Sequence, residues 1–84
     1  MASVEVKLFA SLREAVGIDS QVIDSDDINT VESLLDSFAS QSSEFKQYYK
    51  NHPVLVAVNK VMVEHSHPIQ SNDEVALFPP VTGG

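Results

Sequence analysis

The sequence predicts an α+β domain in which a mixed sheet of four or five strands is covered on one face by one main helix. Three observations support this prediction. Short segments of alternating apolar and polar residues lie at both ends of the chain. Between them, one segment carries apolar residues at helical spacing. A proline pair follows the last alternating segment and should end its strand, because proline donates no backbone hydrogen bond.

Length and composition limit what the chain can do. With 84 residues, 43% of them hydrophobic, residues 1–84 are expected to form a single domain with a modest core. The absence of cysteine excludes a disulfide framework, a thiolate metal site and a cysteine nucleophile. A net charge of −7 argues against nucleic acid as a partner. The sequence contains neither a signal-peptide pattern nor a long apolar run, so we expect a cytoplasmic protein without a membrane partner.

The N-terminal segment predicts a hairpin. A strand is expected over residues 3–10, a short helical turn over 11–16 that Gly17 ends, and a second strand over 21–24. Alternation places two sets of side chains on opposite faces of the first strand: Val4, Val6 and Leu8 toward the core, and Glu5, Lys7 and Phe9 away from it.

The middle of the chain predicts the main helix. It should begin near Asn29 or Thr30, which are good N-caps, and Asn29 with Glu32 has the spacing of a capping box. Its apolar stripe fades over residues 40–43, and a shorter helical piece then runs until residues 52–53, because the residue before proline disfavours helix. The stripe consists of Val31, Leu34, Leu35 and Phe38, and the shorter piece repeats the spacing with Phe45, Tyr48 and Tyr49.

The last third of the chain predicts three strands. Residues 54–58 and 61–64 form a hairpin around the two-residue loop 59–60, residues 71–73 form a turn, and residues 74–78 form the final strand. The loop length sets the pairing of the hairpin, so that one face carries Val56, Val58, Val61 and Val63 and the other carries Leu55, Ala57, Met62 and Glu64.

The order of these elements is that of the β-grasp fold, in which the first and last strands lie side by side at the centre of the sheet. We therefore expect Phe9 and Phe78 to be neighbours on the uncovered face, with Leu55 and Met62 extending the same surface. Single exposed apolar residues are common and need no explanation. Four large apolar side chains on one face favour a protein-docking surface.

Known catalytic patterns are not found in the sequence. There is no Gly-rich phosphate loop, so we expect the chain to bind no ATP directly, and no recognisable nucleophile motif is present. His65 and His67 could supply half of a metal site, but no third ligand has suitable spacing. We predict an exposed loop at this position and no metal.

Residues 79–84, the tail, are the strongest candidate for chemistry. Two prolines hold a semi-rigid extended conformation, and two glycines let the backbone enter a narrow channel in a partner. If the chain ends at Gly84, the terminal carboxyl is the only group at the tip, and as an acyl adenylate it would react with sulfur or amine nucleophiles. The alternative is a frayed C-terminus without a function.

Three segments resemble the MoaD family, the small subunit of molybdopterin synthase. They are residues 73–84, 9–14 and 56–59, and the ending Phe-Pro-Pro-Val-Thr-Gly-Gly is the most specific part. The resemblance covers the whole chain. One departure lies in the turn at 71–73, where the family commonly has a glycine before the aspartate. Asn72 tolerates positive φ, so the turn should form.

The resemblance implies a cycle of sulfur transfer. An ATP-using activating enzyme of the MoeB type adenylates Gly84, and a sulfur source converts the adenylate to a thiocarboxylate. The tail, with Gly83 allowing it to thread, enters a large subunit of the MoaE type. There it gives sulfur to cyclic pyranopterin monophosphate (precursor Z) to form the molybdopterin dithiolene. The chain would thus be an enzyme only together with the large subunit, in a heterotetramer of two small and two large subunits.

The same resemblance, with the strand pattern, assigns partner binding to Phe9, Leu55, Met62, Phe78, Pro79, Pro80, Val81 and Thr82. Three other functions compete with this one. A sulfur carrier of the ThiS type for thiamine synthesis shares the fold and the Gly-Gly ending, but usually lacks the Phe-Pro-Pro stem. A ubiquitin-like modifier would attach Gly84 to lysines of other proteins. A pure interaction module would have an inert tail.

Overall fold

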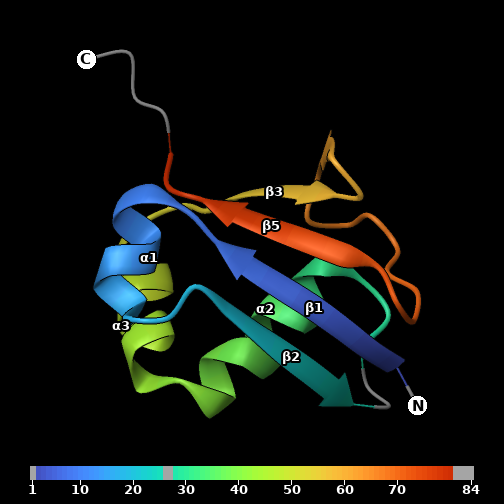
Figure 1. Cartoon of the computed structure of the whole chain (residues 1–84), viewed down its shortest axis with the longest axis horizontal. Coiled ribbons are helices and arrows are strands. Elements are labelled where there is room, and N and C mark those ends of the chain that lie inside the picture. The colour runs from blue at the N-terminus through green and yellow to red at the C-terminus, as the bar shows by residue number, and fades with distance from the viewer. Residues whose placement is uncertain (1, 26–27, 81–84) are drawn as a thin grey trace.

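The computed structural model describes residues 2–25 and 28–80, which form one five-stranded sheet and three helices (Figure 1). The elements follow in the order β1 (Ala2–Leu8), α1 (Ala10–Val16), β2 (Ser20–Ser25), α2 (Val31–Gln41), α3 (Ser43–Asn51), β3 (Leu55–Val58), β4 (Val61–Val63) and β5 (Glu74–Phe78). The predicted α+β class is confirmed.

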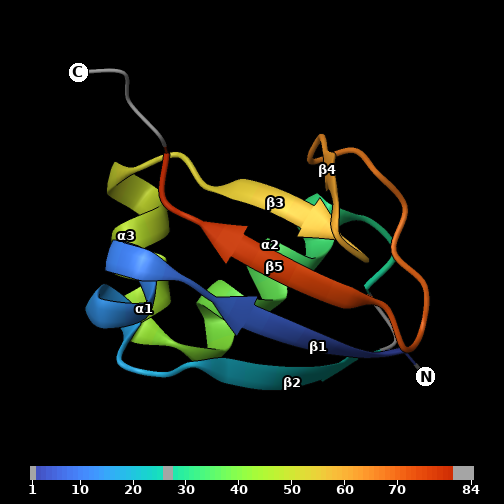
Figure 2. The same cartoon turned by 45° about the horizontal axis from the view of Figure 1, so that its top comes forward.

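The strand order in the sheet is β2-β1-β5-β3-β4. The central strands β1 and β5 are parallel, with Val6 beside Val75 and Leu8 beside Leu77, and every other pair is antiparallel. Figure 2 shows these strands running across the molecule in this order. The first and last strands are therefore neighbours, as predicted from the order of the elements.

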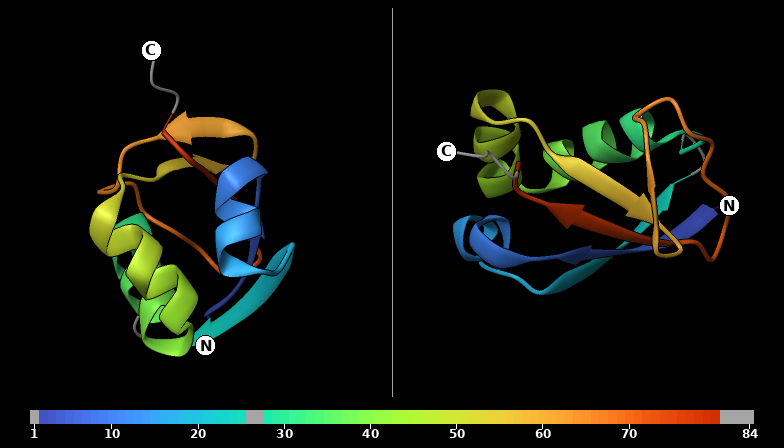
Figure 3. Two further views of the ribbon diagram at one scale, coloured as in Figure 1. Left: turned by 90° about the vertical axis from the view of Figure 1, so that its left-hand side faces the viewer. Right: turned by 90° about the horizontal axis from the view of Figure 1, so that it is seen from above.

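The core lies between the sheet and the helices. Figures 2 and 3 show α2 and α3 on one side of the sheet and α1 at its end, so that no helix of the described residues covers the other face. Alternation in β1 and β5 directs Val6 and Leu77 into the core, and the rings of Phe38 and Phe45 stack there with centroids 4.3 Å apart. The whole predicted helical stripe is buried: Val31, Leu34, Leu35 and Phe38.

The start of α2 differs from the prediction. The capping box joins Thr30 and Ser33, and the one predicted for Asn29 and Glu32 is wrong. The amide of Ser33 donates to Thr30 Oγ1 at 3.2 Å, and the amide of Thr30 donates to Ser33 Oγ at 2.9 Å. Because the N-cap is Thr30, the residue three positions later is Ser33, whose hydroxyl replaces the expected carboxylate.

The end of β1 also differs. The strand stops at Leu8, where residues up to 10 were expected, and Phe9 is the N-cap of α1. Ala10 has a φ of 55°, a left-handed conformation that turns the chain out of the sheet and into α1. The predicted end of α1 is confirmed, because Gly17 closes it with a φ of 89°.

The β3–β4 hairpin has the predicted register, with Val58 opposite Val61 and Val56 opposite Val63. Both loop residues, 59 and 60, have positive φ, as a type I′ turn requires. Although the four valines share one face, they are not equally buried, since Val61 is 62% exposed and Val63 is half-buried. Their strand is at the edge of the sheet, where they border an open hollow of about 380 Å³.

Candidate functional site

The uncovered face of the sheet carries an apolar cluster, which we call the open-face cluster: Phe9, Leu55, Met62 and Phe78. The rings of Phe9 and Phe78 are stacked, with centroids 5.0 Å apart and planes inclined by 13°. Phe9, Leu55 and Met62 are exposed, and Phe78 is half-buried. The structure thus brings together Phe9, Phe78 and Leu55, and places Met62 on the same face at some distance from them.

Strand register positions the members of this cluster. Phe78 lies directly opposite Leu55 in the antiparallel pair β5–β3. The amide of Phe9 donates to the carbonyl of Leu77 at 3.2 Å, which extends the contact between the two central strands by one residue and places Phe9 beside Phe78. Met62 lies further along the same face. It is opposite Ala57 on β3, and Ala57 is opposite Ala76 on β5, so small side chains separate Met62 from the stacked rings.

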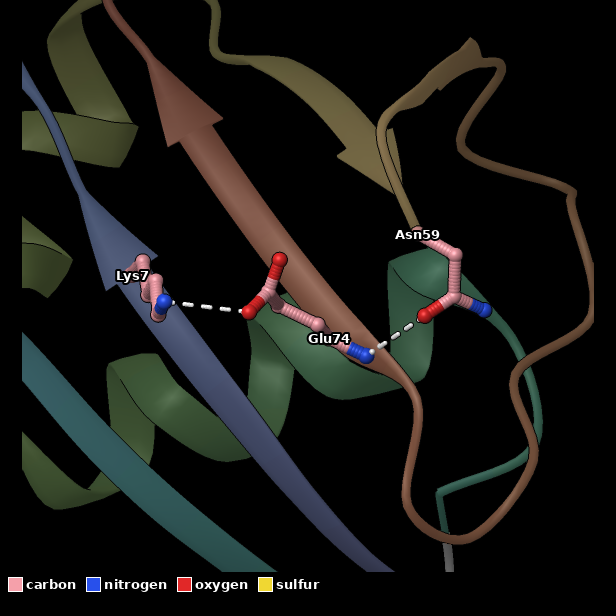
Figure 4. A network of polar contacts seen from close by, with 3 residues as sticks. All are labelled: Lys7, Asn59 and Glu74. Carbon is pink, nitrogen blue, oxygen red and sulfur yellow. Dashed lines mark hydrogen bonds and ion pairs between the residues drawn. The ribbon is translucent and has the colours of Figure 1, made fainter.

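A polar network borders the open face where β5 begins (Figure 4). Lys7 Nζ lies 3.0 Å from Glu74 Oε2, and the amide of Glu74 donates to Asn59 Oδ1 at 3.0 Å. Asn59 Nδ2 donates in turn to Asp73 Oδ1 at 3.0 Å. The hydrogen bond and charge of Glu74, and then the charge of Glu5, raise the pKa of Lys7 above its usual 10.5.

This network fastens the β3–β4 loop to the start of β5. It makes one end of the open face charged, while the end where β5 stops is apolar. The side chains of Lys7 and Glu74 are both partly exposed to solvent, so the network contributes to the shape and polarity of this face more than to stability.

The tail leaves the sheet at the apolar end of the open face. Strand β5 ends at Phe78, as predicted, and Pro79 and Pro80 follow half-buried. Residues 81–84 lie outside the described residues. The roles predicted for Val81, Thr82, Gly83 and Gly84 therefore stay predictions, and so does the docking role of the described residues.

Comparison with known proteins identifies the family. The sequence model of the ThiS family matches residues 6–84. The chain belongs to this family. It is 42% identical, over 81 residues, to the molybdopterin synthase sulfur carrier subunit of Escherichia coli, a match that covers 96% of this chain and 99% of that protein. The subunit of the same name from Haemophilus influenzae is 32% identical with the same coverage.

A solved structure shows the same fold. SAMP1 from Haloferax volcanii, also described as small archaeal modifier protein 1, superimposes with a TM-score of 0.82 at 31% identity. The match covers 99% of this chain and 100% of that chain. The predicted β-grasp fold and the resemblance to the MoaD family are confirmed by these comparisons.

His65 and His67 hold the start of α2 through their backbone carbonyl groups. The carbonyls of His67 and His65 accept hydrogen bonds from the amides of Val31 and Glu32 at 3.0 and 2.9 Å. His65 Nε2 lies 2.9 Å from the carbonyl of Val54. Within residues 2–25 and 28–80 no three metal-ligating side chains gather, and no helix is long and apolar enough to cross a bilayer.

The sequence did not predict that His65 and His67 would cap α2 through their carbonyls, because every residue has a carbonyl group and residue type does not show which one accepts a hydrogen bond. It also did not predict Asn59 as a partner of Glu74. The only signal was the pair Asn59-Lys60, which was interpreted as turn chemistry alone.

Proposed function

We propose that this chain is the sulfur-carrier subunit of a molybdopterin synthase and acts through the carboxyl group of Gly84. The observation that carries the proposal is the exposed stack of Phe9 on Phe78 at the point where β5 passes into the tail. It occurs in a chain that is 42% identical to a sulfur carrier subunit along nearly its whole length. An apolar surface beside the reactive end would dock the partner that receives this end.

In the proposed cycle, the Gly84 carboxylate attacks the α-phosphorus of ATP in an activating enzyme of the MoeB type, and pyrophosphate leaves. Hydrosulfide from a sulfur donor then attacks the acyl adenylate and expels AMP, and a thiocarboxylate remains at Gly84. In the large subunit, the thiocarboxylate sulfur attacks a carbon of cyclic pyranopterin monophosphate, where a C–S bond forms as a C–O bond breaks. Water then hydrolyses the resulting thioester, which leaves the sulfur on the pterin and returns Gly84 to the carboxylate. Two such transfers form the dithiolene. The sulfur travels on the main chain, which agrees with a sequence that has no cysteine.

The partners of the proposed cycle meet the chain at one place. Phe9, Leu55, Met62 and Phe78 bind the large subunit of the MoaE type, while the proline pair aims the tail away from the sheet. Because the activating enzyme must also reach Gly84, it uses the same surface at a different time. The synthase is a heterotetramer of two small and two large subunits in the cytoplasm, and the chain is catalytic only within it.

A second candidate, protein modification, is favoured by the likeness to small archaeal modifier protein 1. An acyl adenylate that is attacked by a lysine amine in place of sulfur forms an isopeptide bond and expels AMP. The first steps of both functions are the same, so only the product separates them.

Intact-mass spectrometry of the chain purified from cells that make molybdenum cofactor tests the proposal. We expect a species in which one oxygen is replaced by sulfur, and we expect its loss in a variant that lacks Gly84. A reconstituted synthase with the large subunit should form molybdopterin with the native chain and not with this variant, since the reactive carbonyl moves by about 3.5 Å per residue. Molybdopterin formation by the shortened chain would contradict the mechanism. Recovery of the chain only in isopeptide conjugates would favour modification.

A further inference from the structure

Strand β2 forms one edge of the sheet (Figure 2), so only one of its two sides is paired with another strand. The amide of Leu8 donates toward β2, to the carbonyl of Asp19 at 2.9 Å, whereas the amides of Glu5 and Phe9 donate toward β5. In an antiparallel pair, the N–H and C=O groups of one residue point toward the partner strand and those of the next residue point away from it. It follows that Gln21 and Ile23 pair with β1, and that Ser20, Val22 and Asp24 direct their N–H and C=O groups outward.

This edge carries one of the features that usually prevent strand addition, the exposed charge of Asp24, and lacks several others. β2 has six residues in unbroken register with β1, and it contains no proline and no lysine. The opposite edge strand, β4, has only three residues. Val22 is 57% exposed. The carbonyl of Val22 accepts a hydrogen bond from Gln21 Nε2 at 3.3 Å. This carbonyl is therefore accessible to a donor from outside the sheet, and the N–H of an added strand would replace the side-chain amide.

A hollow of about 330 Å³ lies on the helix side of this edge. Its lining is mainly polar, from Gln21, Gln41, Ser42 and Glu44. The smaller apolar part comes from Ile18 and from the buried Val16 and Phe38. A strand added beside β2 would direct every second side chain toward the helix side of the sheet. An apolar side chain of that strand would therefore enter the hollow, as in other complexes in which main-chain hydrogen bonds give affinity and pockets give specificity.

The charges around the edge select the partner. Asp24 and Glu44 are exposed acids, and Glu5 stands directly opposite Val22 on the neighbouring strand. The exposed Arg13 is engaged with Asp19, 3.6 Å away. Two copies of this chain, each with a net charge of −7, would bring like charges together if they paired through β2. A basic segment would find complementary charges at the same edge.

We propose that the β2 edge binds an extended, basic segment of a partner protein, which adds to the sheet as a further strand and places an apolar side chain in the hollow beside Phe38. This surface differs from the open-face cluster, because the outward groups of β2 lie at the edge of the sheet and point away from β1. The cluster lies on the face of the sheet, at the ends of β1 and β5 and on β3 and β4. The chain can therefore hold such a partner while the tail enters an enzyme.

The test uses a synthetic peptide, Lys-Lys-Val-Thr-Val-Leu-Val-Lys-Lys, and amide NMR spectra of the full chain. We expect saturable shifts centred on Ser20, Val22 and Asp24, and slower hydrogen exchange of their amides. Val22→Pro removes an outward N–H without removing a bond to β1, and should weaken binding at least about tenfold. Val22→Thr keeps the N–H and the branched side chain, and should weaken binding less than about threefold.

Two further peptides keep the proposal testable if Val22→Pro fails to fold. N-methylation of every second residue blocks one edge of the peptide at a time. We expect the pattern that blocks the edge facing β2 to weaken binding at least about tenfold, and the other pattern to bind like the unmodified peptide, because successive residues of a strand direct their N–H groups to opposite edges. An acidic peptide, with glutamates in place of the lysines, should bind at least about tenfold more weakly. No saturable shift, shifts centred on the open-face cluster, equal binding of the acidic peptide, or a dimer of the chain formed through β2 would each overturn the proposal.

Discussion

The ring of Phe9 stacks on the ring of Phe78, with centroids 5.0 Å apart, although the two residues come from opposite ends of the chain. Phe9 follows β1 as the N-cap of α1, and Phe78 is the last residue of β5. The parallel pairing of β1 with β5 makes them neighbours. Each ring limits the rotamers of the other, so the pair presents a preformed aromatic surface beside the tail.

Phe9→Ala and Phe78→Ala should therefore weaken docking. Each truncation removes an aromatic anchor, for which we expect a loss of about 2 kcal/mol or more, or at least about tenfold in the dissociation constant. Calorimetric titration with the large subunit and with the activating enzyme measures this loss. Val61→Ala is a matched control, because Val61 is an exposed apolar residue on β4 whose side chain lies on the face opposite Met62. If both phenylalanine variants bind both partners as the native chain does, docking occurs elsewhere.

The neighbour relation of Phe9 and Phe78 could be predicted from the sequence because it depends only on period-two alternation and on the order of the elements. The exposure of Val61 could not be predicted in the same way. Alternation assigns a face to each side chain of a strand, but burial also requires another layer over that face. β4 lies at the edge, and its inner face borders an open hollow.

The start of α2 shows a second limit of the sequence. Asn29 and Thr30 are both good caps by residue type, and only the hydrogen bonds of the folded chain decide between them. The pairing of Thr30 with Pro68, together with the amides of Val31 and Glu32 that reach residues 65–67, defines where the helix begins. These contacts join distant segments, so no local pattern predicts them.

Gly83→Val tests the proposed narrow channel. A branched side chain next to the reactive residue should obstruct the passage of the tail into a partner, without affecting the fold. We expect an unchanged melting temperature, together with loss of adenylation, of sulfur transfer or of both in the reconstituted system. The variant Ser43→Val, at an exposed position in the first turn of α3, is a control for the general effect of an added valine. Normal rates in both steps for Gly83→Val would show that the channel is wide.

The ion pair of Lys7 with Glu74 makes a pH-dependent prediction. The pKa of Lys7 is raised in the folded chain, chiefly by Glu74 and less by Glu5. A raised lysine pKa stabilises the fold fully below the ordinary value of 10.5, and this contribution disappears as the pH rises through the folded pKa. Glu74→Gln should thus lower the pKa of Lys7 toward its ordinary value, as NMR titration of the Lys7 side chain can measure.

Glu5→Gln is the matched control for this titration, since it removes the weaker of the two carboxylate influences on Lys7. We expect it to lower the pKa of Lys7 less than Glu74→Gln does. An equal or larger effect of Glu5→Gln would mean that the Lys7–Glu74 contact does not persist in solution.

The capping box of α2 predicts an unequal loss of stability at two neighbouring positions. Thr30→Ala removes one acceptor, that of the Ser33 amide, and should cost about 1 kcal/mol of the free energy of unfolding. Ser33 Oγ accepts from the amides of Asn29 and Thr30 and donates to the carbonyl of Thr30 at 2.8 Å, so Ser33→Ala should cost more than Thr30→Ala.

Urea unfolding of the two variants and of the double variant measures these costs. Because both residues belong to one box, the double variant should lose less than the sum of the single losses. Ser40→Ala is the control, since Ser40 is exposed near the end of the same helix and alanine has the higher helix propensity there. Glu32→Ala tests the box first expected from the sequence, and should lose only about 0.3–1 kcal/mol, the contribution of a carboxylate in the first turn. A larger loss for Glu32→Ala than for Ser33→Ala would assign the cap to the carboxylate and contradict the geometry of the hydroxyl.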